Sequence, residues 1–206
     1  TPPAGEPTAF EIFEDFDDDT HFSQGGSVPD GWLATGSDSY TTPHRQYALD
    51  GGVFANSGDY VLFSQEQIGA ERNEVLFTPM MKLAAGKEAS ISFFIYAPGG
   101  SPVATFYSSV DVKAGTAQSL DAQTIELGGT NAACSEWTEV KYTFTPEADG
   151  EYCFSISFKE TASFRDCGNI AIDDVTITGY APAEGGEVTP PAGEPTAFEI
   201  FEDFDD

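Results

Sequence analysis

The sequence predicts an all-β protein, a jelly-roll β-sandwich of two packed antiparallel sheets. Short runs of β-branched and aromatic residues are bounded by Gly, Pro, Asn and Asp, and helical periodicity is weak. In the runs SISFFIY and EVKYTFT apolar side chains alternate with polar ones, which is typical of a sheet that packs on one face only. Strands that follow one another without helices between them indicate a sandwich or a jelly roll.

Turn signals divide the chain into expected strands. These strands cover residues 10–16, 60–63, 74–77, 89–96, 103–109, 123–126, 138–144, 150–158 and 169–178. One domain is therefore expected over residues 10–179. A domain of that size buries about 70% of the surface that its unfolded chain exposes, so it needs no metal or disulfide merely to fold.

The two ends of the chain carry the same sequence, because residues 1–18 recur without a change as residues 189–206. A period of about 190 residues indicates whole domains in tandem rather than small solenoid units. The Pro-, Gly- and Glu-rich residues 1–9 and 180–197 are then linkers, and residues 198–206 are the first strand of the next repeat. Such copies suit a protein that builds length or avidity.

The charge of the chain restricts its partners. The 35 acidic residues outnumber the 8 basic ones, for a formal net charge of −27. Nucleic acid and anionic lipid surfaces are excluded as partners, since both need a basic surface. An acidic surface suits a secreted or cell-surface protein, as a merely soluble coat or as a collector of divalent cations. No run of about 18 apolar residues is present, so we expect no direct membrane insertion.

The three cysteines do not form a metal motif. Cys134, Cys153 and Cys167 lack CxxC spacing and histidine partners, so a zinc site is not expected. A disulfide between Cys134 and Cys167 is favoured because both lie beside loops, whereas Cys153 lies in an apolar strand pattern. Three reduced thiols remain the alternative.

A set of short motifs follows in order along residues 10–178. The set comprises FEDFD at 13–17, PDGW at 29–32, SGDY at 57–60, LFTP at 76–79, ISFF at 91–94, Trp137 and IAIDDV at 170–175. In this order the motifs resemble MAM domains and the bacterial cleaved-adhesin or choice-of-anchor domains. The cysteine pattern of eukaryotic MAM domains is missing, which favours the bacterial version.

The resemblance implies a galactose-binding-like jelly roll. It also implies an extracellular module for adhesion to a glycan or to a host or cell-surface protein, and in many members a structural calcium ion. Calcium takes six to eight hard oxygen ligands, and the acidic motifs at the two ends of the domain supply carboxylates for it. The expected ligands are Glu14, Asp17 and Asp174, with Asp59 and Asp173 beside them. The alternative is a solvated acidic turn and an ordinary strand end.

Two further observations bear on the calcium site. Glu14 shares a strand face with Phe10, Ile12 and Phe16, so it is expected to point inward and to need a partner. The terminal strands of a jelly roll can be neighbours, in which case the ion would tie the first strand to the last. No DxDxDG series is present, so an EF-hand is excluded.

Exposed aromatic side chains are the second kind of candidate site, because they stack on sugar rings. Tyr40, His44, Arg45 and Tyr47 lie in a loop that is too long to be only a connector, and they form the expected ligand-binding set. The two tryptophans, Trp32 and Trp137, are expected in the core rather than on a platform.

The repeated strand is expected to contact a neighbouring repeat. Phe198, Ile200, Phe201 and Phe204 would be buried if the strand added to the edge of another unit's sheet and propagated an end-to-end assembly. The alternative is a row of domains joined by linkers alone.

No enzymatic motif supports catalysis. The two histidines, His21 and His44, lack a Ser or Cys nucleophile pattern. The sequence therefore predicts a structural or adhesive repeat, with a carbohydrate-binding module as the alternative and no enzyme.

Overall fold

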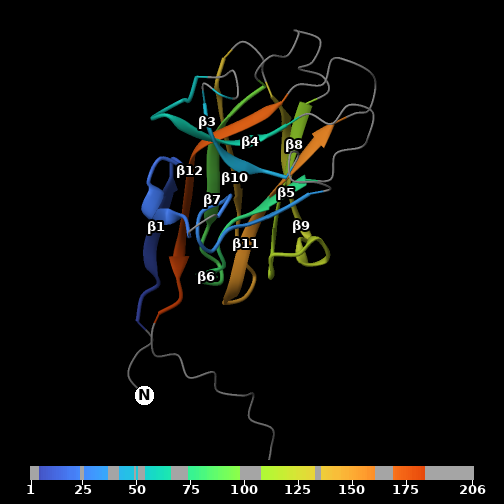
Figure 1. The fold of residues 1–206 in the computed structure, drawn as a ribbon. Helices are drawn as coiled ribbons and strands as arrows, with labels where there is room; N and C mark the ends of the chain where they lie inside the picture. The colour runs from blue at the N-terminus through green and yellow to red at the C-terminus, as the bar shows by residue number, and fades with distance from the viewer. Residues whose placement is uncertain are drawn as a thin grey trace, which may run out of the picture.

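The computed structural model describes residues 5–23, 26–36, 42–48, 50, 54–65, 74–97, 108–132, 136–160 and 169–183. Within these residues two six-stranded antiparallel sheets pack face to face (Figure 1). The predicted fold class, an all-β jelly-roll sandwich, is confirmed.

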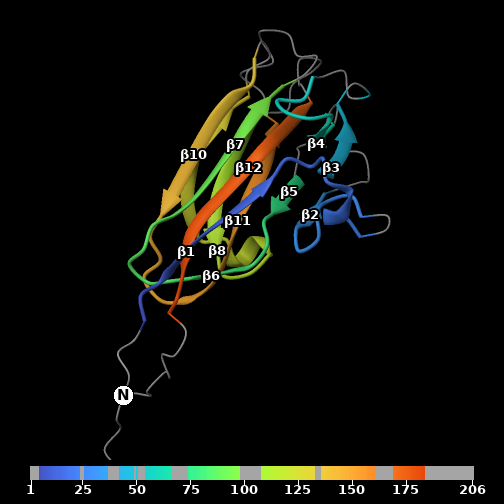
Figure 2. The same cartoon turned by 90° about the vertical axis from the view of Figure 1, so that its left-hand side faces the viewer.

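The first sheet contains both terminal strands of the domain. Its strands run in the order β10 (Thr138–Phe144), β7 (Ala89–Tyr96), β12 (Ile170–Ala181), β4 (Tyr60–Ser64) and β3 (His44–Tyr47), and β1 (Thr8–Glu14) also pairs with β12. Figure 2 shows β10, β7, β12 and β1 side by side. One edge of β12 is filled by β7, and the other edge is shared by β4 and β1.

The second sheet is built around the long strand β11. Its order is β2 (Leu33–Thr35), β5 (Glu74–Phe77), β11 (Gly150–Glu160), β8 (Ser108–Gly115) and β9 (Ile125–Asn131), and β6 (Met81–Leu83) also pairs with β11. Two 3-10 turns, η1 (Asp19–His21) and η3 (Leu120–Ala122), lie between strands.

The core lies between the inner faces of the two sheets. Alternate residues of β7, Ile91, Phe93 and Ile95, are fully buried, as are Phe154 and Ile156 of β11. Burial of apolar side chains at every second position is what the sequence alternation predicts for a one-sided sheet. A smaller cluster of Ala48, Val61, Phe63 and Ala171 packs separately.

Most expected strands are present, and three of them, β5, β7 and β10, have the expected bounds. The strand expected at 103–109 lies mostly outside the described residues, and β8 runs from Ser108 to Gly115. Two expectations need correction. The strand expected at 10–16 is β1, from Thr8 to Glu14, because the backbone at Phe16 is left-handed, and the one expected at 123–126 is β9, from Ile125 to Asn131. In β8 alternation of buried Val110, Val112 and Ala114 with polar residues continues past 109. Three short strands, β2, β3 and β6, were not expected, because LAT, HRQY and MKL are not runs of β-branched and aromatic residues.

The first strand lies beside the last, as expected. β1 pairs antiparallel with β12 from Thr8 opposite Ala181 to Glu14 opposite Val175. The register of β12 against β7 shifts between Asp173 and Thr176, which marks a β-bulge where β1 ends. The acidic turn after β1 is thereby brought to the acidic bulge of β12.

Cys153 of β11 is a buried free thiol. Burial raises the pKa of this thiol, while the side chain of Gln123 lies 3.2 Å from its Sγ. Cys134 and Cys167 lie outside the described residues, and so does their expected disulfide. No described helix has the length and apolar character needed to cross a membrane.

Candidate functional site

Three segments far apart in the sequence meet at one end of β1. They are the acidic turn after β1 (residues 15–19), the loop before β4 (residues 54–59) and the bulge of β12 (residues 173–174). These segments contain the FEDFD, SGDY and IAIDDV motifs, so three of the motifs form one polar cluster, here called the acidic junction.

Asp17 connects the acidic turn to the loop before β4. Its Oδ1 accepts a hydrogen bond from the backbone N–H of Asp59 at 2.8 Å. Its Oδ2 is buried and has no hydrogen-bond partner among the described residues. A buried carboxylate oxygen without a donor is costly, so this atom is the part of the junction most suited to a cation.

The β12 bulge holds the same loop from the other side. Asp173 Oδ2 accepts from the backbone N–H groups of Asn56 and Ser57, at 2.8 and 3.2 Å. The Asp174 carboxylate accepts from Asn56 Nδ2 at 2.6 Å and from Ser57 Oγ. Asn56 and Ser57 thus fix both carboxylates of the IDDV motif.

Asp173 is fully buried, and this burial dominates its titration. Desolvation, with a smaller contribution from the charge of Asp174, raises the pKa of Asp173 to about 7, although backbone N–H donors oppose the shift. Ionisation of Asp173 therefore places two like charges next to each other, at a cost that a cation would offset.

Two non-glycine residues of the junction have left-handed backbone conformations. Phe16 has φ 62° and Asp174 has φ 49°. Such conformations are uncommon for residues with a Cβ atom and mark places that the surrounding structure holds in position. Phe16 is completely buried beside Trp32, with their ring centroids 6.3 Å apart. The core thus fixes the turn that presents Asp17.

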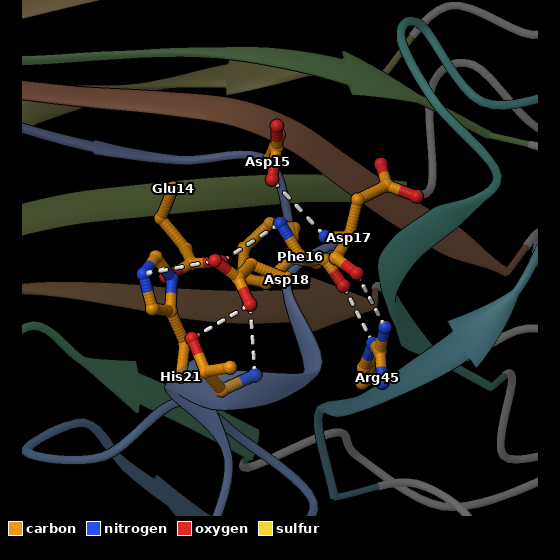
Figure 3. Close-up of polar contacts among 8 residues, drawn as sticks. Glu14, Asp15, Phe16, Asp17, Asp18, His21 and Arg45 are labelled. Atoms are coloured by element: carbon orange, nitrogen blue, oxygen red, sulfur yellow. Dashed lines mark hydrogen bonds and ion pairs between the residues drawn. The ribbon is translucent and has the colours of Figure 1, made fainter.

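Glu14 points inward and has partners, as its position in the strand predicts. It is 4% exposed, and its Oε1 accepts from the backbone N–H of Phe16 at 2.8 Å. Its Oε2 lies 2.9 Å from Nδ1 of His21 (Figure 3). Burial raises the pKa of Glu14, and the contacts with Phe16 and His21 partly oppose the shift. Both oxygens of Glu14 are therefore occupied within its own turn and η1.

Arg45 of β3 clamps the acidic turn. Its Nε donates to the carbonyl oxygen of Phe16 at 2.5 Å, and its Nη2 donates to that of Asp17 at 3.0 Å. Its Nη1 forms an ion pair with Asp19 at 2.6 Å. Figure 3 shows the guanidinium group facing the turn.

The Arg45 side chain is also held by aromatic rings. Its guanidinium carbon lies 3.7 Å from the ring centroid of Tyr60 and 4.6 Å from that of Phe22. Cations over aromatic faces are stabilised most where they are shielded from water, and the Arg45 side chain is only 14% exposed. Arg45 thus supplies a positive charge to the acidic turn from within the same domain.

Two other members of the expected ligand-binding set, His44 and Tyr47, lie on β3. The His44 ring packs edge-on against Phe63, and its Nδ1 is 2.9 Å from the carbonyl oxygen of Thr42. Tyr47 packs against Tyr60. Tyr40 lies outside the described residues, as do Phe198, Ile200, Phe201 and Phe204 of the expected inter-repeat contact.

The expected metal ligands divide between two sets of contacts. Asp17, Asp59, Asp173 and Asp174 belong to the acidic junction, whereas Glu14 pairs with His21. Among the described residues no group of three or more His, Cys, Asp or Glu side chains is arranged to hold a metal ion. Calcium also accepts hydroxyl, amide and backbone oxygens, and Ser57 and Asn56 supply such atoms beside the carboxylates. The unpartnered Oδ2 of Asp17 fits a hard cation.

The tryptophans have different environments. Trp32 is 8% exposed and belongs to the core, as expected. Trp137 is half-buried at the start of β10, with its ring centroid 5.5 Å from that of Tyr96 and its Nε1 donating to the carbonyl oxygen of Phe54 at 2.8 Å. Phe54 is 81% exposed. We call Phe54, Tyr96 and Trp137 the aromatic patch, which sequence reasoning missed because Phe54 lies in a glycine-rich loop without a strand pattern.

Comparison with known proteins identifies the family of this acidic β-sandwich. The model of the MAM domain (meprin/A5/mu) matches residues 13–181, and the chain belongs to this family. A search of curated proteins gives no match.

Solved structures share the fold at low sequence identity. A cleaved adhesin domain of Lys-gingipain from Porphyromonas gingivalis is 16% identical with a TM-score of 0.59, over 82% of this chain and 98% of that one. A second cleaved adhesin domain of Lys-gingipain is 15% identical with a TM-score of 0.58, over 82% and 99%. The carbohydrate-binding module TmCBM61, solved in complex with β-1,4-galactotriose, is 15% identical with a TM-score of 0.50, over 72% and 88%. These likenesses confirm the jelly-roll fold.

Proposed function

We propose that the chain is a structural and adhesive repeat unit of a secreted or cell-surface fibre or stalk, and that calcium stabilises it at the acidic junction. The observation that carries the proposal is the unchanged recurrence of residues 1–18 at residues 189–206, since repeated domains add length and avidity. The fold shared with the cleaved adhesin domains and the net charge of −27 support an extracellular setting.

Calcium would be held by residues that the domain already brings together. Asp17 provides the buried, unpartnered Oδ2, and Asp173 and Asp174 provide carboxylates that bind the same loop before β4. Asp59 belongs to this set through the hydrogen bond from its backbone N–H to Asp17. The ion would neutralise part of the negative charge of the junction. Glu14 lies apart from this set, because its carboxylate pairs with His21 and the backbone of Phe16 instead of the loop before β4.

The test of the repeat function is the location of the protein. Antibodies raised against the chain should label intact cells of the source organism, and the label should disappear after brief protease treatment of those cells. Labelling that requires lysis of the cells would rule out a surface repeat. A cytoplasmic protein released from broken cells serves as the control for leakage.

Carbohydrate binding is the second candidate function, and the aromatic patch favours it. Phe54 is a large, exposed ring, and its backbone carbonyl oxygen accepts the hydrogen bond that fixes the indole of Trp137 against Tyr96. Rings held in this way offer flat apolar faces to sugars. The shared fold with TmCBM61 supports this alternative.

The carbohydrate alternative is tested on a glycan array. Phe54→Ala should abolish any specific binding, whereas Leu120→Ala, which removes another exposed apolar side chain, should leave it unchanged. The two exposed fractions are 81% and 60%, so both variants should retain the stability of the parent protein. Binding that survives Phe54→Ala, or no binding to any glycan, would reject the aromatic patch as the site.

A further inference from the structure

The strand β1 occupies a well-defined slot along β12. Seven residues of β1 are in register with Val175–Ala181, and β12 is the only strand with which β1 pairs among the described residues. Phe10 and Ile12 pack from β1 against the main core. The slot is therefore an edge of β12 with apolar positions at fixed spacing, which an extended strand of the right sequence fills.

A second segment of the same chain has the sequence that fills this slot. Residues 196–202 repeat residues 8–14 letter for letter, so Phe198 and Ile200 correspond to Phe10 and Ile12. Every side-chain interaction that one copy makes with β12 is chemically available to the other. The two copies differ only in how the chain connects them to the domain.

The chain connection allows the second copy to reach the slot. β12 ends at Ala181, which is the residue opposite Thr8 in the pairing, so a strand in the slot begins about 5 Å from the end of β12. Residues 182–195 lie between β12 and the second copy, and an extended chain of that length reaches up to about 45 Å, which is far more than the slot requires. The second copy would thus return antiparallel to β12 as the next strand of a hairpin.

We propose that the β1 slot on β12 has two alternative occupants, residues 8–14 and residues 196–202 of the same chain. The proposal rests on the proposed function, because it specifies how one repeat joins the next. When residues 196–202 occupy the slot, the first strand of the following repeat belongs to the sheet of the preceding one. Both copies offer β12 the same backbone and the same side chains, so the chain connections alone decide the occupant.

The test is a pair of matched substitutions in the full chain. Ile12→Asp disables the first copy, and Ile200→Asp disables the second. If the second copy can replace the first, Ile12→Asp alone should lower the melting temperature only slightly. The same substitution in the Ile200→Asp background should then lower the melting temperature by about 5 °C or more.

The loss of melting temperature in the two backgrounds shows whether the second copy can replace the first. The proposal is overturned if Ile12→Asp lowers the melting temperature equally in the parent chain and in the Ile200→Asp chain, because the second copy would then provide no rescue. Rescue that disappears on dilution would also overturn it, since the rescuing strand would come from another molecule. Glu11→Gln and Glu199→Gln, at an outward-facing position, are the matched controls and should be silent in every combination. Surface labelling of cells tests the proposed function independently of this result.

Discussion

The carboxylate of Asp17 lies against the backbone of Gly58, so closely that a Cβ atom at residue 58 would overlap with the side chain of Asp17. Gly58 also has φ +58°, a conformation that favours glycine. The acidic turn and the loop before β4 therefore meet at a point where no side chain fits. This contact positions the unpartnered Oδ2 of Asp17 in the acidic junction.

Gly58→Ala should destabilise the domain by about 3 kcal/mol or more, because it adds an overlap to a left-handed conformation. Gly86→Ala is the control, since Gly86 has φ +70° and nothing lies within 4 Å of its Cβ position. The control should cost about 1 kcal/mol from the backbone conformation alone. Equal losses of unfolding free energy in urea for both variants would show that the Asp17–Gly58 contact is unimportant.

Arg45→Met should destabilise the domain by about 2–3 kcal/mol, because it leaves the carbonyl oxygens of Phe16 and Asp17 without a donor and removes the cation between two rings. Lys159→Met is the matched control. Lys159 forms an exposed ion pair with Asp111 at 2.9 Å, which is worth at most about 1 kcal/mol. The unfolding free energy of both variants is measured in denaturant. A loss for Arg45→Met no larger than the loss for Lys159→Met would contradict the role of Arg45 as a clamp.

The pKa of Asp173, raised to about 7 by burial, predicts a dependence of stability on pH. Between about pH 4 and pH 7 the folded protein keeps a proton on Asp173 that the unfolded chain has released. The contribution of Asp173 to stability therefore falls as the pH rises through this window and levels off above it.

Asp173→Asn removes this titration. In the presence of a chelator, the difference in unfolding free energy between wild type and variant should change by a few kcal/mol from pH 4 to pH 8, in favour of the variant at pH 8. Taking the difference between the two proteins cancels the pH dependence that comes from the other carboxylates. Any loss of stability from placing the Asn amide against the N–H donors does not depend on pH. A difference that stays constant with pH would mean that Asp173 is ionised throughout.

The sequence was sufficient for the strands whose alternation is long. β7 and β10 each contain seven or eight residues with one apolar face, and their predicted bounds agree with the structure. β3 was not predicted because HRQY contains no alternation, and only pairing with β4 makes it a strand. Its formation depends on a tertiary contact, which local periodicity does not record.

The sequence predicted which carboxylates belong to the site but not the hydrogen bonds that connect them. Carboxylates at both ends of the domain indicated that Asp17 and Asp174 belong to one region, and the pairing of β1 with β12 brings their segments together. The roles of Asn56 and Ser57 were not predicted, because they depend on a loop whose residues have no motif beyond SGDY. The contacts of Arg45 with the carbonyl oxygens of the acidic turn were not predicted, because they join segments that lie far apart in the sequence.

The central claim is that a calcium ion stabilises the acidic junction, and the melting temperature tests it most directly. Millimolar calcium should raise the melting temperature of the wild type above its value in chelator, because an ion that binds only the folded state stabilises it. Asp17→Asn should abolish the increase, whereas Glu126→Gln, which changes an exposed carboxylate on β9, should retain it. An identical melting temperature of the wild type in calcium and in chelator would contradict the claim.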